Sequence, residues 1–290
     1  MKQPKGIILA LVCLDIILSI AISAFKAQST VANKLDYQII ERSQYKIHVV
    51  TIPNNGKYQV KPVMTGDLQP ITEFVEANTV VAINGGYFDP VNQKTTSFMV
   101  ERSQIVADPR FNERLVDNPD LKPYLRKIFN RAEFRRYDCE GIAKYDIQLH
   151  FAPIPKDCNL IASLGGGPGL LPENSSVAEG FLAYRDGEKI RDAIGNDSLN
   201  ARSAVGITKD GKVVFVMVAQ DRQQPLNSGI SLPQLAAEMS NLGAVKAMNL
   251  DGGSSTSLYY DDRAIFGRVD REGQQIVRPI KSVLSVIMVN

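Results

Sequence analysis

The sequence predicts an α+β fold, in which a mixed, largely antiparallel β-sheet with packed helices forms a single globular domain after an N-terminal membrane-targeting segment. Three observations favour this class. Short apolar or alternating runs recur along the chain, as is typical of half-buried strands. Helical periodicity is confined to a few segments. Finally, Asp210-Gly211 stands between two apolar runs, and Asp-Gly strongly favours the tight turn of an antiparallel hairpin.

The predicted strands are short and apolar or alternating. They span 45–52, 59–64, 79–83, 97–100, 147–151, 204–208, 213–218 and 244–250. Helices are predicted over 70–77, over a charged stretch at 119–132 and over 231–242. In the last of these, Ser231 can cap the first turn, Pro233 suits that turn, and Gly243 favours the end of the helix.

Residues 1–27 are typical of a signal peptide or membrane anchor. Lys2 and Lys5 precede an almost wholly apolar run, so we expect membrane contact through residues 7–25. Asp15 would cost roughly 3 kcal/mol at the centre of a spanning helix, so cleavage and retention both stay open. Residues 28–290 would then be exported, either anchored and facing the periplasm or cell exterior, or secreted.

The composition indicates a folded body without a general charge bias. The 290 residues are 44% hydrophobic and 22% charged, which is enough to bury a sizeable core. The formal charge is +2, but residues 1–27 contribute three lysines and one aspartate, 3 − 1 = +2, so the body is close to neutral. Nucleic acid is therefore not expected as a partner, and the oligomeric state is not indicated.

Export to an oxidising compartment would allow two cysteines of residues 28–290 to form a disulfide. Cys139 and Cys158 are 158 − 139 = 19 positions apart, and disulfides persist outside the cytoplasm. A bridge across this loop would contribute roughly 3 kcal/mol in the chain-entropy model. We predict the disulfide, with two free thiols as the alternative.

Glycine-rich motifs follow several predicted strands. The segment 249–256 places a carboxylate, two glycines and three hydroxyl residues after a strand, and 84–89 repeats the pattern with Asn-Gly-Gly-Tyr-Phe-Asp. A third cluster lies at 165–169, and Arg202 stands at the entry to another strand. Glycines at strand ends permit close backbone approach, so these motifs favour a ligand cleft.

Together the motifs resemble the phosphodiester glycosidase family, typified by N-acetylglucosamine-1-phosphodiester alpha-N-acetylglucosaminidase. The resemblance covers about 75–290 and is carried by the segments 84–88, 165–168, 202–206 and 249–256. It implies a hydrolase that cleaves the glycosidic bond of a sugar-1-phosphodiester in envelope or extracellular glycans. Two departures stand out: Arg202-Ser203 replaces an Arg-Thr pair common in the family, and 108–158 is an insertion that the resemblance does not explain.

This chemistry assigns roles to the motif residues. An oxocarbenium-like transition state needs a carboxylate as nucleophile or base, for which Asp251 is the first choice and Asp89 the possible second member of a pair. Arg202 could hold the phosphate through its planar donors. The predicted substrate-binding residues are Asn84, Gly85, Gly86, Tyr87, Gly166, Gly167, Asn249, Gly252, Gly253, Ser254, Ser255 and Thr256.

Other interpretations stay open. His48 and His150 lie in strand patterns, so neither a serine-hydrolase triad nor a histidine metal site is favoured, and no cofactor is required. A divalent cation on Asp251 would instead give a metal-dependent phosphodiesterase. A non-catalytic glycan-binding or exopolysaccharide-export accessory protein is a further alternative. Within the insertion, 122–136 reads as a basic amphipathic helix, either a solvated face or a lid or lipid contact.

Overall fold

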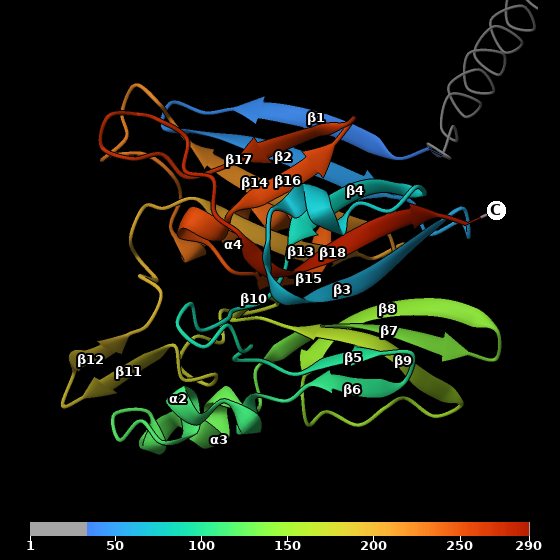
Figure 1. The fold of residues 1–290 in the computed structure, drawn as a ribbon, viewed down its shortest axis with the longest axis horizontal. Coiled ribbons are helices and arrows are strands. Elements are labelled where there is room, and N and C mark those ends of the chain that lie inside the picture. Colours follow the sequence, from blue (N-terminus) through green and yellow to red (C-terminus); the bar gives the residue numbers. More distant parts are fainter. Residues whose placement is uncertain (1–33, 290) are drawn as a thin grey trace, which may run out of the picture. The chain divides into compact units, whose positions relative to one another are not determined.

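The fold, seen in a computed structural model that describes residues 34–289, is mostly β (Figure 1). Strands take up 46% of the described residues and helices 12%. The strand ladders within this range are antiparallel, and residues Leu35–Asn290 form one compact unit. The predicted α+β class is therefore wrong, because few helices pack on the sheets. The predicted targeting segment 1–27 lies outside the described residues.

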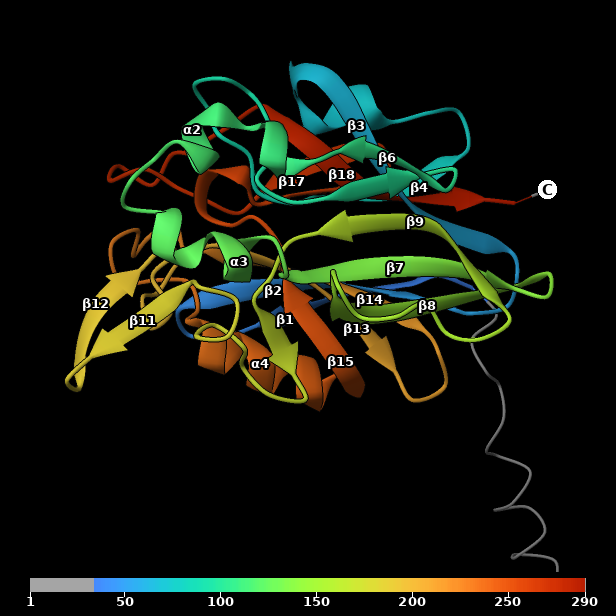
Figure 2. The ribbon, with the colours of Figure 1, turned by 90° about the horizontal axis from the view of Figure 1, so that it is seen from below.

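Three larger sheets and one small ribbon make up the described fold. The first sheet contains, in order, β1 (Asp36–Glu41), β2 (Tyr45–Ile52), β14 (Val213–Gln220), β13 (Arg202–Thr208), β15 (Ala244–Asn249) and β10 (Gly169–Leu171). The second contains β17 (Arg263–Phe266), β16 (Ser257–Tyr260), β4 (Thr79–Asn84), β18 (Ile280–Met288) and β3 (Tyr58–Gln69). The third contains β6 (Gln104–Ala107), β5 (Met99–Glu101), β9 (Cys158–Gly165), β7 (Ala132–Cys139) and β8 (Ile142–Leu149). The ribbon of β11 (Leu182–Arg185) and β12 (Glu188–Asp192) stands apart from the sheets (Figures 1 and 2).

One hydrophobic core joins the three sheets. Val205 and Phe215 enter it from the first sheet, Ile83 from the second, and Phe134 and Leu164 from the third. Each fully buried aliphatic or aromatic side chain of this kind contributes about 1.5–3 kcal/mol. The shared core holds the sheets against one another, so residues at their common edges are placed by packing from several sides.

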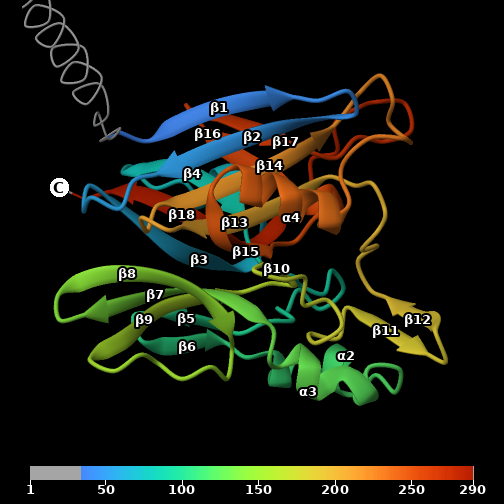
Figure 3. The same ribbon diagram turned by 180° about the vertical axis from the view of Figure 1, so that it is seen from behind.

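The longest described helix, α4 (Leu232–Asn241), covers the outer face of the first sheet (Figure 3). Ser231 and Gln234 form a capping box, which confirms the predicted helix start. The other helical segments are single turns. They are η1 (Ile71–Phe74), η2 (Pro109–Phe111), α2 (Glu113–Val116), η3 (Lys122–Tyr124), α3 (Leu125–Ile128) and η4 (Gly253–Ser255).

The basic amphipathic helix predicted over 122–136 is wrong, as is the helix over 119–132. Only α3 is α-helical there, and β7 begins at Ala132. From that point the pattern has a period of two: Ala132 and Phe134 enter the core, whereas Glu133 and Arg135 pair on the opposite face at 2.6 Å. The insertion 108–158 therefore supplies β7 and β8 to the third sheet.

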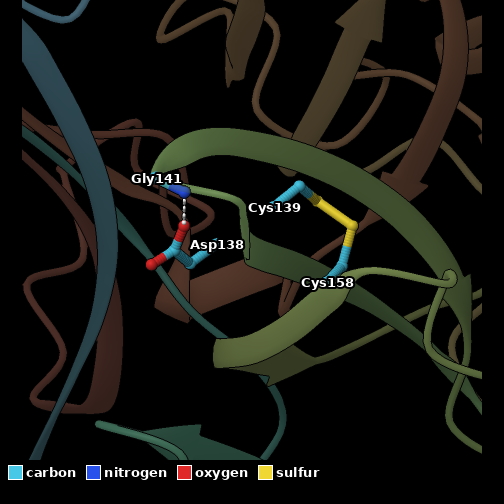
Figure 4. The surroundings of a disulfide bond; sticks show 4 residues. All are labelled: Asp138, Cys139, Gly141 and Cys158. Atoms are coloured by element: carbon cyan, nitrogen blue, oxygen red, sulfur yellow. Dashed lines mark hydrogen bonds between the residues drawn. A yellow bond between two sulfur atoms is a disulfide. The ribbon is translucent and has the colours of Figure 1, made fainter.

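Two local predictions are confirmed. Gly211 has a φ of +80° in the turn between the paired strands β13 and β14. Cys139 and Cys158 form a disulfide, and they lie opposite each other on β7 and β9 with Cα atoms 4.0 Å apart (Figure 4). In the adjoining turn, Gly141 N–H donates to the Asp138 carboxylate over 2.7 Å. The bridge therefore joins two strands that are already neighbours.

Within residues 34–289, no helix has the length and apolar character needed to cross a membrane.

Candidate active site

The candidate site lies where the first and second sheets meet. The segments that follow β4 and β15 are joined there, because Asp251 N–H donates to the Gly85 carbonyl over 3.0 Å. Leu250 N–H donates to the carbonyl of Ser203, on β13, over 2.8 Å. Three motifs that lie far apart in the sequence are thus brought together by backbone hydrogen bonds.

A small cavity opens among these segments. Its volume is about 140 Å³, below the roughly 300–1,000 Å³ of sites that enclose a small molecule, so it fits a reacting centre better than a whole substrate. It is lined by Tyr87, Ile194, Asn200, Arg202, Asp251, Gly252 and Gly253. Ile194 and Asn200 are absent from the predicted site, although Asn200 lies two positions before Arg202.

Asp251 is a partly buried carboxylate at this cavity. Burial raises its pKa from the usual 3.8 to about 6, against the opposing effects of Ser255, Arg278 and the Gly252 N–H. The Gly252 N–H donates to Oδ1 over 2.9 Å. Ser255 Oγ lies near the carboxylate but without an aligned hydrogen bond. A carboxyl group with a pKa near neutrality can exchange a proton during a reaction.

Arg202 is 2% exposed, and its donors are already largely used. Nε donates to the carbonyl of Ile230 (3.4 Å), Nη1 to Ile194 (3.0 Å), and Nη2 to Gly195 (2.5 Å) and Ser198 (3.2 Å). No carboxylate within the described range forms an ion pair with it. Burial lowers the pKa of the guanidinium. Arg202 therefore holds the 194–198 loop and adds positive charge to the cavity wall, rather than presenting a free planar fork.

The two predicted asparagines are fully buried and bind protein atoms. Asn84 Nδ2 donates to the Asp251 carbonyl over 2.7 Å, and its Oδ1 accepts from Ser203 Oγ (2.6 Å) and Ser257 N–H (3.0 Å). Asn249 Nδ2 donates to the Tyr87 hydroxyl over 2.7 Å. Asn84 thereby fixes the backbone that carries the carboxylate, which is a positioning role.

Tyr87 connects this wall to the glycine cluster. Its hydroxyl donates to the Gly167 carbonyl over 2.8 Å and accepts from Asn249. Burial, followed by the Asp251 charge, raises the pKa of Tyr87, so the hydroxyl stays protonated. Its ring packs against Phe181 with centroids 5.6 Å apart. Tyr87 lines the cavity while its hydroxyl belongs to the scaffold.

The predicted glycines serve close packing. A Cβ on Gly86 would overlap the Gly165 carbonyl oxygen, and one on Gly85 would overlap Ser282. A Cβ on Gly166 would lie 2.7 Å from the Met248 methyl group, and one on Gly167 would overlap the Glu179 carboxylate. These glycines hold the segments together. Only Gly252 and Gly253 line the cavity itself.

The three hydroxyl residues after these glycines differ in their surroundings. Ser254 Oγ accepts from Arg278 Nη1 over 2.8 Å. Ser255 and Thr256 are 1% and 0% exposed, and within the described part of the chain their hydroxyls have no hydrogen-bond partner. They lie behind the cavity wall, so their predicted substrate contact stays untested.

A comparison with known families decides the class of this site. A model of the phosphodiester glycosidase family matches residues 77–287. The chain belongs to the phosphodiester glycosidase family. The resemblance of the sequence motifs is thereby confirmed, and with it the assignment to hydrolases of this type.

Solved structures share the fold of this phosphodiester glycosidase at low identity. The catalytic domain of zebrafish N-acetylglucosamine-1-phosphodiester alpha-N-acetylglucosaminidase, auto-inhibited by its pro-peptide, gives a TM-score of 0.62 at 16% identity, covering 90% of this chain and 86% of that one. A Burkholderia pseudomallei K96243 protein described as exported gives 0.59 at 16%, covering 86% and 75%. A hypothetical protein from Synechocystis gives 0.55 at 15%; 88% of this chain spans 62% of that protein. No curated protein matches the chain.

The structure does not bring Asp89 to the cavity of this phosphodiester glycosidase. Its Oδ2 accepts from Arg114 Nε over 2.8 Å, and its Oδ1 accepts from Val91 N–H over 2.8 Å. Burial raises the pKa of Asp89, but these hydrogen bonds outweigh it and leave the pKa below its usual value. Asp89 stabilises a turn, so Asp251 is the one carboxylate among the described lining residues.

Two arginines near the site were not predicted from the sequence. Arg278 donates to Ser254, lies over the Phe88 ring at 5.1 Å, and lowers the pKa of Asp251. Arg268 Nη1 donates to the side-chain oxygen of Asn200, which lines the cavity. Both come from the loop between β17 and β18, where no strand-end motif marks them.

Proposed function

We propose that the protein hydrolyses the glycosidic bond of a sugar-1-phosphodiester in envelope or extracellular glycans. The observation that carries the proposal is Asp251, a partly buried carboxylate with its pKa raised to about 6 at the cavity of a phosphodiester glycosidase domain. The named substrate of the zebrafish relative, an N-acetylglucosamine-1-phosphodiester, supports the choice of substrate class.

The proposed reaction uses Asp251 on the sugar C1 atom, either as nucleophile or as base for the attacking water. The bond from C1 to the phosphate oxygen breaks, a phosphate monoester leaves with the electron pair, and the water oxygen becomes bonded to C1 while one proton of the water passes to Asp251. Such a leaving group carries negative charge well, so it needs no carboxylic acid to protonate it. This agrees with the described lining of the cavity, which does not include Asp89.

Positive charge around the cavity suits the phosphate. Arg202 lines the cavity with its charge unpaired by carboxylates, and Arg268 and Arg278 bind the neighbouring Asn200 and Ser254. Because the Arg202 donors are held by backbone carbonyls, we assign it an electrostatic role toward the leaving group. The Asn200 side chain offers a polar contact for a sugar hydroxyl or a phosphate oxygen.

The test compares hydrolysis of a sugar-1-phosphodiester with that of an aryl glycoside of the same sugar, by full-length protein with and without EDTA. We expect release of free sugar and phosphate monoester from the phosphodiester, unaffected by EDTA. Release of sugar 1-phosphate instead would indicate cleavage at phosphorus, and loss of activity with EDTA would favour the metal-dependent phosphodiesterase. No turnover of any such substrate would favour a glycan-binding or export accessory protein.

We also propose that residues 28–290 act outside the cytoplasm. The basic, apolar N-terminal segment, the disulfide and the Burkholderia relative described as exported support this location. Cell fractionation with N-terminal sequencing should place the protein in membranes, or secreted after cleavage near residues 24–27. A soluble cytoplasmic pool with an intact N-terminus would contradict it.

A further inference from the structure

A second cleft lies between the second and third sheets, lined mainly by residues of β3 and β18 on one side and of β5, β7 and β9 on the other. Figure 1 shows these two sheets one above the other. Its volume is about 300 Å³, at the lower end of the roughly 300–1,000 Å³ range of small-molecule sites. It shares no lining residue with the cavity at Asp251. The cleft is therefore separate from the candidate active site, and a ligand bound in it would contact different residues.

The guanidinium of Arg136 is the unusual group in this cleft. Its Nε is buried and has no hydrogen-bond partner anywhere in residues 34–289. The residue opposite it on β9 is Ala162, whose methyl group leaves space beside the arginine. A donor without an acceptor on a charged group is costly. An anion bound in the cleft beside this side chain would offset the uncompensated charge of the guanidinium.

The rest of the lining indicates what else the ligand would carry. Lys61 and Arg102 add positive charge, and Lys61 pairs with Glu76 at 2.9 Å, so the cations exceed the carboxylates by one. Glu101 is a partly buried acceptor that would bind hydroxyl donors, and burial raises its pKa. Apolar surface comes from Pro62, Val63, Ile161, Ala162 and Ile287.

We propose that this cleft binds one anionic sugar unit, with its carboxylate or phosphate on Arg136, its hydroxyls on Glu101 and its ring on the aliphatic side chains. Charge-assisted bonds from a partly buried arginine give such a site its anion selectivity. The site goes beyond the proposed hydrolysis and does not depend on it. It would hold a second unit of an acidic glycan away from the reacting bond.

The test is calorimetric titration of the full chain in detergent with glucuronate, glucose 6-phosphate, glucose and inorganic phosphate. We expect both sugar anions to bind at least tenfold more tightly than glucose or inorganic phosphate. Arg136→Gln should weaken them at least tenfold, whereas Arg263→Gln, at an exposed position on β17 outside both cavities, should change nothing. If Arg136→Gln fails to fold, Lys61→Gln should weaken binding severalfold.

Three results would overturn the proposal. Unchanged binding of sugar anions in folded Arg136→Gln would remove the anion contact. If glucose bound as tightly as the sugar anions, the ligand's charge would not matter. If inorganic phosphate bound as tightly, its sugar ring would not matter. Loss of binding in Asp251→Asn would place the ligand in the other cavity. Hydrolysis is not measured in any arm, so failure of the proposed reaction leaves this result unaffected.

Discussion

Replacing Asp251 by Asn should stabilise the protein at neutral pH. In the folded state the pKa of Asp251 lies near 6 rather than 3.8, a difference of about two units. At about 1.36 kcal/mol per unit, ionising this carboxyl group costs up to about 3 kcal/mol of folding free energy. For an acid with a raised pKa, this cost is absent below about pH 4 and complete above about pH 6. Asn cannot ionise, yet its oxygen can still accept from the Gly252 N–H.

The assay is urea unfolding of wild type and Asp251→Asn at roughly pH 4 and pH 7.5. We expect similar stability at the lower pH and a more stable variant, by up to about 3 kcal/mol, at the higher. Asp89→Asn is the matched control, because the pKa of Asp89 is lowered: its ionised carboxylate stabilises the fold above about pH 3.8 and loses this effect only at lower pH, so this variant should be less stable than wild type at both pH values. An Asp251→Asn difference that is the same at both pH values would refute the reasoning.

The same variant tests the chemistry. With ionised Asp251 as the reactive form, wild-type kcat/KM should rise with pH through about 6. Asp251→Asn should lose about 10²–10⁴-fold in turnover while still binding substrate. Asp89→Asn should keep turnover within about tenfold, because that side chain is bound in a turn with Arg114. Comparable losses in both variants would contradict a single-carboxylate site.

Three further outcomes follow from contacts described above. Arg202→Lys should lower the free energy of unfolding in urea by about 1–3 kcal/mol, because an ammonium group cannot donate to all four carbonyls, but it should keep the preference for phosphodiester over aryl glycoside. Arg202→Met should lose both stability and this preference. An unchanged preference in Arg202→Met would exclude the electrostatic role. Replacing both Cys139 and Cys158 by Ser should lower the free energy of unfolding by about 3 kcal/mol, and reduced wild type should match it. Gly86→Ala should destabilise by about 1–3 kcal/mol through overlap with the Gly165 carbonyl, whereas Gly66→Ala, which meets nothing within 4 Å, should unfold like wild type.

Much of the scaffold could be predicted because burial leaves a periodic signature. The predicted strand 45–52 coincides with β2, whose interior positions are almost all buried, and the helix capped by Ser231 is α4. The fold class was wrong because β7 carries Glu133 and Arg135, whose charges suggested a solvated helix. These two residues neutralise each other inside the protein at 2.6 Å, and such a partnership leaves no trace in local periodicity. The strands β11 and β12 were not predicted, because they are largely exposed and their sequences show no apolar face.

The candidate site was predicted as far as its residues lie in strand-end motifs. Asp251, Tyr87 and the glycine pair after Asp251 do line one cavity, because the motifs end strands that meet there. The loop that occupies the Arg202 donors could not be predicted, because it contributes backbone carbonyls and any sequence has those. Arg278 reaches the site from a long loop, where nothing in the spacing of residues marks it.

The hydrogen bonds of Asn84 also have a consequence for how the protein becomes active. This side chain binds the Asp251 carbonyl 167 positions away and Ser203 119 positions away. Contacts of such high sequence separation form late and slowly, because long loops must close before any of them stabilises the chain. The carboxylate therefore acquires its final surroundings only after the first and second sheets have docked. A chain that is still folding would therefore lack a competent site, so the onset of activity should report completion of folding.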